Sequence, residues 1–442
     1  MANMKLKETV SSFLKRENAE SQPFLLALSG GADSASLFHI LLNLGKKFHV
    51  AHVDHGWRES SAQEAKQIQE QCEDAEIPFH LLTLKPSEIE GNLEDGCRRA
   101  RLAFFSHLCE IHGLKAVMTG HHGGDQAETV LKRVLEGASF SALCAMREQS
   151  LHQSLLVWRP LLSTNKEKIY KYLESNGLSF IVDPSNDNPT YLRARMRKNI
   201  FPYLQNEFSK NISSNLCYIA EQSRNLDFYL EEKLSHYLEH RVKGPFGVLM
   251  NFSGHHPFEI EWLLRKWMYQ ENETLTRTQM QNAVHLLHNH DANKQIPLSN
   301  GTLYIDRAYL FYSSYNFLRT SSEEVFLEDG QKIGNWTCSL SKVEQDENLG
   351  WKEVWKGTCA CSLGEGDYYL KYPSINEMRS SSELLSKWWS KQKVPAFMRQ
   401  VVPVLMKEGK VVQEFLSGRH LSEIKSDRYL TLTCFLDSQA NC

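Results

Sequence analysis

FLLALSGGADSASLFHILLNL, residues 24–44, decides how the first part of this chain folds. Its apolar beginning, Phe24 to Leu28, predicts a buried strand, and the helical spacing of Leu37 and Leu41 predicts a helix after it. A glycine-rich turn, residues 29–34, lies between the two. Glycines let backbone N–H groups turn toward a bound oxygen, and the start of a helix carries a partial positive charge. The stretch therefore predicts an anion-binding loop.

Three polar side chains of this turn bear on its ligand. Ser29 and Ser34 carry hydroxyl groups that donate hydrogen bonds, whereas Asp33 brings negative charge. A divalent cation between Asp33 and a phosphate would remove the repulsion between their negative charges. The alternative is that Asp33 only caps the helix. The turn has neither the G-x-x-x-x-G-K-[ST] pattern of a Walker loop nor the glycine spacing of a dinucleotide fingerprint.

The turn resembles the PP-loop of the N-type ATP pyrophosphatases, whose signature is S-G-G-x-D-S. This resemblance implies that ATP is cleaved between its α and β phosphates. It also implies that an acceptor oxygen is adenylated and that a nucleophile then displaces AMP. The ATP-binding residues implied by it are those of the whole turn, Ser29, Gly30, Gly31, Ala32, Asp33 and Ser34.

The first two hundred residues repeat the strand and helix pattern. Apolar runs predict further strands at residues 48–53, 78–84, 115–119 and 155–159, with helical stretches between them. Strands joined by helical crossovers form a doubly wound parallel sheet, so the predicted fold class is α/β. In such a sheet, ligands bind at the carboxyl ends of the strands.

Titratable side chains follow two of the predicted strands. His52 and Asp54 lie at the end of the second strand, and we expect them to contact ATP beside the loop. His121, Asp125 and Glu128 follow the fourth strand. Asp125 and Glu128 are one helical turn apart and share a face. The residues alone leave three roles open for this pair: helix capping, Mg²⁺ binding, or holding a cationic amine.

Basic residues are concentrated in two places, although the net charge of the chain is only -3. Arg98, Arg99 and Arg101 fall within four positions, where a solvated helix face is the ordinary explanation. The second group is Arg193, Arg195 and Arg197. Because their spacing of two spreads them around a helix, we expect them partly in a loop that enters the site. A planar guanidinium suits phosphate or an anionic transition state.

A chain of 442 residues is too long for a single core. We expect a catalytic domain at 1–210, a mainly helical middle domain at 211–320 and a small α+β domain at 321–442, where tryptophans and lysines near residue 388 suit contact with RNA. Within the later domains, residues 303–312 predict a strand or hairpin arm, and the apolar runs 402–406 and 411–415 predict a hairpin across Glu408 and Gly409. The first twenty residues lack the apolar region of a signal peptide, and no apolar run is long enough to span a membrane. Ten cysteines form no C-x-x-C motif. These features predict a cytoplasmic protein without a membrane partner and argue against zinc.

Five segments occur in the order seen in the tRNA(Ile)-lysidine synthetases, and the chain resembles the long, three-domain form of that family. They are Ser29–Ser34, His52–Arg58, Gly120–Thr129, Arg159–Leu162 and Asp183–Pro202, and the carboxyl-terminal run KWWSKQKVPAFMRQVVPVL is similar as well. The resemblance implies ATP-dependent ligation of L-lysine to the wobble cytidine of an isoleucine tRNA with a CAU anticodon. The predicted fold is thus adenine nucleotide α-hydrolase-like.

The family resemblance also implies roles for individual residues. Asp33 and Asp125 would hold Mg²⁺ or position reacting groups, and Arg193 and Arg195 would act in catalysis. His121, Glu128 and Arg197 would bind substrates, Glu128 by holding the lysine amine and Arg197 by contacting the cytidine or the leaving phosphates. A base such as His121 or a carboxylate would take the proton of the amine.

Three positions depart from the family pattern. Gly124 stands where an aspartate is usual, Glu136 where an arginine is usual, and Ala194 where an asparagine is usual. Two alternatives therefore stay open: another PP-loop enzyme that thiolates tRNA, and a catalytically degenerate tRNA-binding protein. The absence of C-x-x-C counts against thiolation. The oligomeric state is open, with a homodimer as one alternative.

Overall fold

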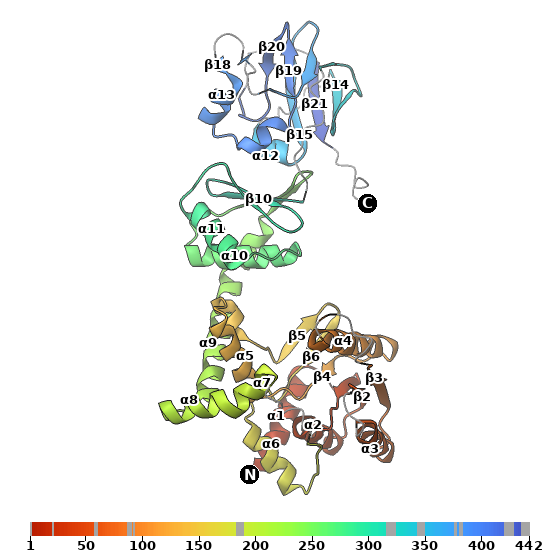
Figure 1. Cartoon of the computed structure of the whole chain (residues 1–442). Helices are drawn as coiled ribbons and strands as arrows, with labels where there is room; N and C mark the ends of the chain where they lie inside the picture. Colours follow the sequence, from red (N-terminus) through yellow and green to blue (C-terminus); the bar gives the residue numbers. More distant parts are fainter. Residues whose placement is uncertain are drawn as a thin grey trace. The chain divides into compact units, whose positions relative to one another are not determined.

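The computed structural model comprises two compact units, residues 1–228 and 229–442 (Figure 1). It describes residues 2–19, 22–56, 61–85, 91, 93–182, 190–314, 324–342, 350–374, 378–379, 383–419 and 428–434. Arg58 and residues 183–189, which carry part of the family resemblance, lie outside these ranges. The division into three domains stays a prediction.

The first unit is built on a six-stranded sheet in the order β3-β2-β1-β4-β6-β5. Its strands are β1 (Phe24–Ala27), β2 (Phe48–Asp54), β3 (Phe79–Thr83), β4 (Val117–Met118), β5 (Gln149–His152) and β6 (Leu155–Trp158). Neighbouring strands are parallel except for the edge pair β5 and β6. The predicted doubly wound parallel sheet is confirmed, and β5 is an addition that the apolar pattern did not indicate.

Helices cover both faces of this sheet (Figure 1). One apolar core joins the sheet to α1 (Ala2–Arg16), α2 (Ala32–Asn43), α3 (Ser61–Asp74) and α6 (Lys166–Ser175). The other joins it to α4 (Leu93–Ile111). Strand alternation explains the split along β2, because Phe48 and Val50 pack in the first core and Ala51 packs in the second.

A third cluster fixes the helices that carry the site. The elements are α5 (Gly123–Leu135), η2 (Phe140–Cys144), α7 (Leu192–Arg195), the π turn η4 (Met196–Ile200) and α8 (Phe201–Phe208). Ala127 and Val130 of α5 pack against Met196 and Phe201. The arginines at 193, 195 and 197 therefore lie on helical backbone, and the expected loop was wrong. Burial of Ala194 and Met196 between them stabilises the helix.

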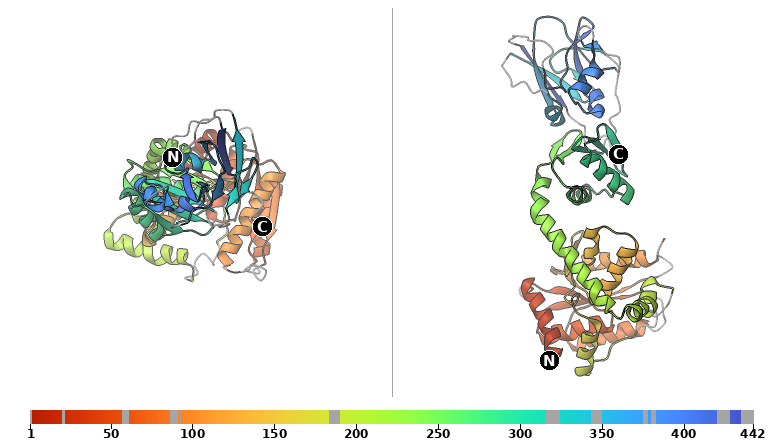
Figure 2. Two further views of the ribbon diagram at one scale, coloured as in Figure 1. Left: turned by 90° about the horizontal axis from the view of Figure 1, so that it is seen from above. Right: turned by 90° about the vertical axis from the view of Figure 1, so that its left-hand side faces the viewer.

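Helix α9 (Ile212–Glu239) runs through the boundary between the units, and the right-hand view of Figure 2 shows it unbroken. A five-stranded sheet, β7-β8-β11-β10-β9, then packs with two helices. The elements are β7 (Val242–Gly244), β8 (Gly247–Asn251), α10 (Pro257–Gln270), α11 (Arg277–His288), β9 (Lys294–Pro297), β10 (Thr302–Asp306) and β11 (Tyr309–Ser313). The helices were predicted from the sequence, as was a strand or hairpin arm near residue 305.

Two further sheets complete the second unit, in the orders β12-β16-β19-β20-β17-β18 and β13-β14-β21-β15. Their strands are β12 (Val325–Phe326), β13 (Lys332–Ile333), β14 (Trp336–Ser341), β15 (Thr358–Leu363), β16 (Tyr369–Lys371), β17 (Met378–Arg379), β18 (Glu383–Leu384), β19 (Val404–Lys407), β20 (Lys410–Gln413) and β21 (Arg428–Cys434). The helices are α12 (Trp351–Trp355), α13 (Leu385–Lys391) and η5 (Ala396–Gln400). The predicted hairpin turn at Glu408 and Gly409 is confirmed, with φ of 51° and 71°.

No helix in the described part of the chain has the length and apolar character needed to cross a bilayer.

Candidate functional site

The loop after β1 is held in one shape by its own hydroxyl groups. Ser34 Oγ donates to the carbonyl of Gly31 at 3.1 Å and accepts from the backbone N–H of Ser29 at 3.2 Å. The two hydroxyl oxygens of Ser29 and Ser34 lie 3.1 Å apart. Helix α2 has Gly31 at its N-cap and no side-chain cap, so Asp33 does not cap the helix. The capping interpretation of Asp33 was wrong, and its charge has another use.

Two glycines of this region are required by the geometry. Gly30 has φ of +83°, and a Cβ there would lie 2.5 Å from Ile181 Cδ1. The carbonyl of Gly30 also accepts a hydrogen bond from Ile181 N at 2.9 Å, which ties the loop to the segment after α6. A Cβ on Gly120 would lie 3.1 Å from the Cβ of Asp33. Glycine at residue 120 therefore lets the turn before α5 pack closely against the loop.

His122 lies between two carboxylates from different elements. Its Nε2 is 3.7 Å from Asp33 Oδ1 and 3.8 Å from Asp125 Oδ2. A capping box fixes the ring: His122 Nδ1 accepts from Gly124 N at 2.8 Å, and Asp125 Oδ2 accepts from His122 N at 3.0 Å. His122 was not among the predicted site residues, which included His121, because histidine is not one of the residues that usually cap a helix start.

The contacts of Asp125 and Glu128 bear on the three roles left open for this pair: helix capping, Mg²⁺ binding and holding a cationic amine. Asp125 takes part in the cap, and both carboxylates also bind the guanidinium of Arg197. Arg197 Nη2 lies 2.9 Å from Asp125 Oδ1 and 3.1 Å from Glu128 Oε2, and Arg197 Nε donates to Glu128 Oε1. The pair is thus a cation-binding pair in this structure. The side chain of Glu128 is only 5% exposed.

The carboxyl groups of this cluster differ in pKa. Burial raises the pKa of Asp33, and the nearby Asp125 charge adds to that effect, although His122 opposes it. Burial also raises the pKa of Glu128 against the opposing effect of Arg197. For Asp125, burial is outweighed by His122 and by the backbone hydrogen bond, so its pKa is lowered. Burial is therefore not fully compensated at Asp33 and Glu128, and of these two only Glu128 is hydrogen-bonded to Arg197.

Asp33 also fits the metal ion that the loop implies. Its Oδ1 atom is buried and accepts no hydrogen bond from the described residues. A buried carboxylate oxygen without a donor is costly, and a divalent cation prefers such oxygen ligands. Asp125 lies close to Asp33, because both carboxylates are within 3.8 Å of the same atom, His122 Nε2. The residues present therefore fit Mg²⁺.

His52 and Asp54 are both buried at the carboxyl end of β2, as predicted. His52 Nδ1 is 2.7 Å from the carbonyl of Leu28, the residue before the loop. Asp54 accepts a hydrogen bond from Gly56 N at 2.8 Å and so shapes the chain after the strand. In this structure both side chains brace backbone beside the loop, and contact with ATP stays a prediction for them.

His121 is held by Thr119, whose Oγ1 lies 2.8 Å from His121 Nδ1. Burial lowers its pKa to about 4, and three arginines, Arg159, Arg101 and Arg193, add to this against the opposing effect of Asp125. The imidazole is consequently neutral near pH 7. A neutral imidazole can accept a proton, but a pKa of about 4 makes this one a weak base.

The arginines around His121 form a cationic cluster from three elements. Burial lowers the pKa of Arg101, with Arg98 and Arg193 contributing, and burial together with Arg98 lowers the pKa of Arg159. Arg159 donates to the carbonyl of Arg147 at 2.9 Å and to Ser150 Oγ at 2.8 Å, but its buried Nε has no partner among the described residues. Like charges held together in this way favour an anion.

The arginines of the α7 segment have three different surroundings. Arg197 binds the acidic pair, Arg193 is near Arg101, and Arg195 is exposed and donates to the carbonyl of Thr190 at 2.8 Å. The expectation of separate targets fits this arrangement. Arg159 was not among the predicted site residues, because the sequence around an arginine at the end of a strand does not show which residues its side chain contacts.

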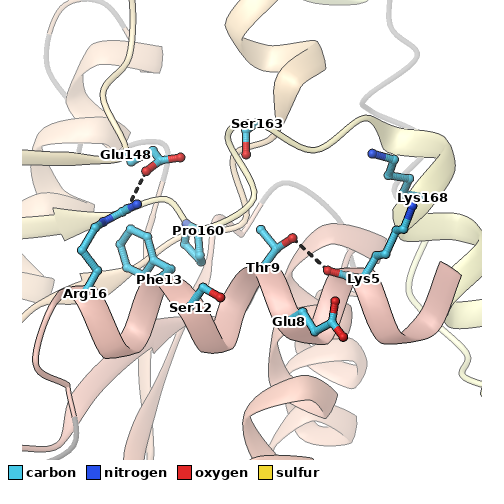
Figure 3. Close-up of a pocket in the computed structure, with 10 residues that line it drawn as sticks. All are labelled: Lys5, Glu8, Thr9, Ser12, Phe13, Arg16, Glu148, Pro160, Ser163 and Lys168. Atoms are coloured by element: carbon cyan, nitrogen blue, oxygen red, sulfur yellow. Dashed lines mark hydrogen bonds and ion pairs between the residues drawn. The ribbon is translucent and has the colours of Figure 1, made fainter. Parts of the chain in front are cut away.

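A separate pocket of about 480 Å³ lies along α1 and shares no residue with the loop or the acidic cluster. Figure 3 shows Arg16 paired with Glu148 across it, and the side chains of Lys5 and Lys168 near its other end. The pocket is open to solvent and formed by the helix surface.

The comparisons with known proteins agree among themselves. Residues 2–204 match the PP-loop domain family, a match that implies use of ATP. The chain is 36% identical over 421 residues to the tRNA(Ile)-lysidine synthase of Protochlamydia amoebophila (strain UWE25), covering 92% of each chain. It is 44% identical over 211 residues to that of Chlamydia pneumoniae, covering 48% of this chain and 66% of the relative. For Chlamydia trachomatis serovar D the identity is 38% over 258 residues, covering 57% of this chain and 78% of the relative.

Proposed function

Because this chain belongs to the tRNA(Ile)-lysidine synthase family, we propose that it joins L-lysine to the wobble cytidine of an isoleucine tRNA with a CAU anticodon. In the first step the O2 atom of the base attacks the α phosphorus of ATP, and pyrophosphate leaves. In the second step the lysine ε-amine attacks C2 of the adenylated base, the bond from C2 to oxygen breaks, and AMP leaves. The amine gives up its protons to a base or to water.

The observation that carries this proposal is the unsatisfied carboxylate of Asp33 beside a phosphate-type loop. Asp33 Oδ1 is buried without a hydrogen-bond donor, and Asp125 lies on the other side of His122. In the proposal Asp33 and Asp125 hold Mg²⁺, which would neutralise phosphate charge. Residues Ser29 to Ser34 supply the backbone and hydroxyl donors for ATP. His52 and Asp54 keep that loop and the adjoining strand end in place and contact the nucleotide.

The lysine amine is assigned to the acidic pair on α5. Asp125 and Glu128 already bind a cation, the guanidinium of Arg197. An ammonium group has the same charge and also donates several hydrogen bonds. We propose that lysine takes a place on Glu128 and that Arg197 turns part of its fork toward the cytidine or a phosphate. His121 is assigned as the acceptor of the proton that the amine loses, although its pKa of about 4 makes it a weak base.

The cationic cluster near His121 is assigned to negative charge on the substrates. Arg193 and Arg101 lie next to each other there, and Arg193 would stabilise the charge that develops as pyrophosphate or AMP leaves. Arg195 is exposed and would act from the tRNA side. Ala194, where the family pattern has an asparagine, is buried among the packed residues of this helix.

The remaining parts of the proposal concern the rest of the chain. The carboxyl-terminal domain, residues 321–442, would contact the tRNA, with Trp388 and the lysines of α13 as candidates. Trp388 Nε1 donates to Glu414 at 3.2 Å, so its ring is held in a fixed orientation.

A homodimer is the alternative to a monomer, and sedimentation of the purified chain distinguishes them.

The decisive experiment is transfer of labelled lysine to unmodified isoleucine tRNA by the purified chain, with and without ATP. We expect ATP-dependent incorporation, release of AMP, and a mass gain on the wobble cytidine equal to lysine minus water. A sulfur mass gain would instead identify a thiolating enzyme. Binding of tRNA without ATP–pyrophosphate exchange would identify a degenerate tRNA-binding protein. Either outcome overturns the proposal.

A further inference from the structure

Three histidines from three separate elements meet at the amino-terminal edge of the sheet in the first unit. His49 is the second residue of β2, His80 the second residue of β3, and His112 follows the last residue of α4. Asp54, at the loop end of β2, is five residues from His49, which corresponds to about 16 Å along a strand. The three histidines are therefore separate from the proposed ATP site.

Strand register explains why these side chains meet. Ala51 of β2 pairs with His80 of β3, so the two residues point to the same face of the sheet. His49 is two residues before Ala51 and points to that face as well. Helix α4 covers this face through Phe105 and Leu108. His112 is four residues after Leu108, so it continues the same side of the helix.

The imidazole nitrogens are close enough to share one ion. His49 Nδ1 lies 3.0 Å from His80 Nε2, and one nitrogen from each of the three rings lies within 4.8 Å of the others. Two imidazole nitrogens on a tetrahedral zinc ion are separated by roughly 3.3 Å, given Zn–N bonds of about 2.0–2.1 Å. His112 is exposed, so a rotation of its side chain can close the remaining distance without disturbing the core.

The protonation state of the rings also suits a metal ion. Burial lowers the pKa of His49 and of His80, and the neighbouring His112 lowers both further. A neutral imidazole is the form that ligates metals. The rings are stacked or tilted against one another, with centroids 4.7–5.3 Å apart. A hydrogen-bonded stack without an ion is the competing explanation.

We propose that His49, His80 and His112 form a binding site for a divalent transition-metal ion such as Zn²⁺, with water in the fourth position. Imidazole is a suitable ligand for this class of ions, and three such ligands leave one coordination place open. The ion would join β2, β3 and the end of α4, and would thereby stabilise the amino-terminal ends of these strands. The ATP loop lies at the opposite, carboxyl-terminal ends of the strands. The cysteine pattern argued against zinc, but it carries no information on histidines separated by about 30 residues each.

The test is calorimetric titration of the full chain with Zn²⁺ in the absence of ATP, for the natural sequence and two single variants. His112→Ala removes one ligand from an exposed position, so the fold should be retained. The control is His107→Ala, an exposed histidine on α4 outside the group. We expect one tight Zn²⁺ ion per natural chain and per His107→Ala chain. In His112→Ala the affinity should fall by more than about 100-fold, because even a residue that only supports a ligand is worth about 10–100-fold.

Two further readouts make the result independent of activity. Co²⁺ should give the visible absorption of a tetrahedral site in the natural chain and in His107→Ala, and lose it in His112→Ala. Zn²⁺ should raise the melting temperature of the same two proteins only. If the natural chain binds no Zn²⁺ at micromolar concentration, or if His112→Ala binds it as the natural chain does, the proposal is wrong.

Discussion

Replacing Arg197 by methionine should destabilise α5 and the packing around it, because the change leaves two buried carboxylates without their positively charged partner. Methionine keeps most of the apolar stem and removes the fork that binds Asp125 and Glu128. The side chains of these acids are 12% and 5% exposed, whereas that of Arg197 is 37% exposed. The loss therefore falls on the acids, which cannot move to solvent.

The size of the effect follows from the burial of the three groups. Removing one partner of a fully buried ion pair costs about 3–5 kcal/mol. Since more than a third of Arg197 is exposed, water can enter the vacated space, and we lower the estimate to about 2–3 kcal/mol. In a unit of this size each kcal/mol shifts the melting temperature by about 2–4 °C, so the expected decrease is about 4–12 °C.

Thermal unfolding of the full chain measures this shift, and hydrogen exchange of peptides from α5 assigns it to the site. Arg195→Met is the matched control, because Arg195 lies two residues away, is exposed and donates to the backbone carbonyl of Thr190. Its effect should stay within about 0.5 kcal/mol. In a Glu128→Gln background, Arg197→Met should cost at least about 1 kcal/mol less, since one carboxylate is already neutral. Equal melting temperatures for the two arginine variants would refute the reasoning.

Three further outcomes are expected from the same unit. Asp33→Asn should abolish AMP formation while tRNA affinity and melting temperature are retained, since it removes an uncompensated charge; retained turnover in a pyrophosphate-release assay would contradict the metal role. Gly30→Ala should weaken ATP binding and lower the free energy of unfolding by about 1–3 kcal/mol, because φ is positive there and the new Cβ would meet Ile181. The control is Gly45→Ala, which also has a positive φ but open space around it. This control should leave ATP affinity unchanged in titration calorimetry. His121 has its pKa lowered to about 4, so it contributes stability above its unfolded pKa of about 6.5 that is lost as pH falls toward 4. His121→Gln should reduce the loss of stability over that range by up to about 3 kcal/mol in thermal unfolding, and an unchanged pH profile would count against a buried neutral ring.

The parts of the fold that could be predicted are those fixed by local pattern. An apolar run followed by S-G-G-x-D-S predicts β1, the loop and α2 because strand, glycine turn and helix signals are adjacent in sequence. The hairpin at Glu408 and Gly409 was predicted for the same reason, and both residues do adopt positive φ. Strands β5 and β7 are short edge strands whose pairing depends on distant neighbours, so no local pattern indicates them.

The site was predicted in part, and the missed residues share one property. Asp33, Asp125, Glu128 and Arg197 were singled out from the sequence, and the structure brings them into one cluster. His122 and Arg159 were missed as site residues because their importance comes from side chains far apart in sequence. The sequence also cannot tell which of two adjacent histidines lies between Asp33 and Asp125; the capping box of α5 decides it.

The acidic cluster itself explains why a cation belongs in it. Asp33, Asp125 and Glu128 are three carboxylates, and among the described residues one guanidinium, that of Arg197, is hydrogen-bonded to Asp125 and Glu128. Counting these directly paired groups leaves a formal excess of two negative charges. Burial makes that excess costly: burial raises the pKa of Asp33, and the charge of Asp125 raises it further. A divalent ion at Asp33 would by itself remove this formal excess while leaving the packing of α5 as it is. An ammonium group at Glu128 would add one further positive charge, which in the proposal faces the phosphates of ATP.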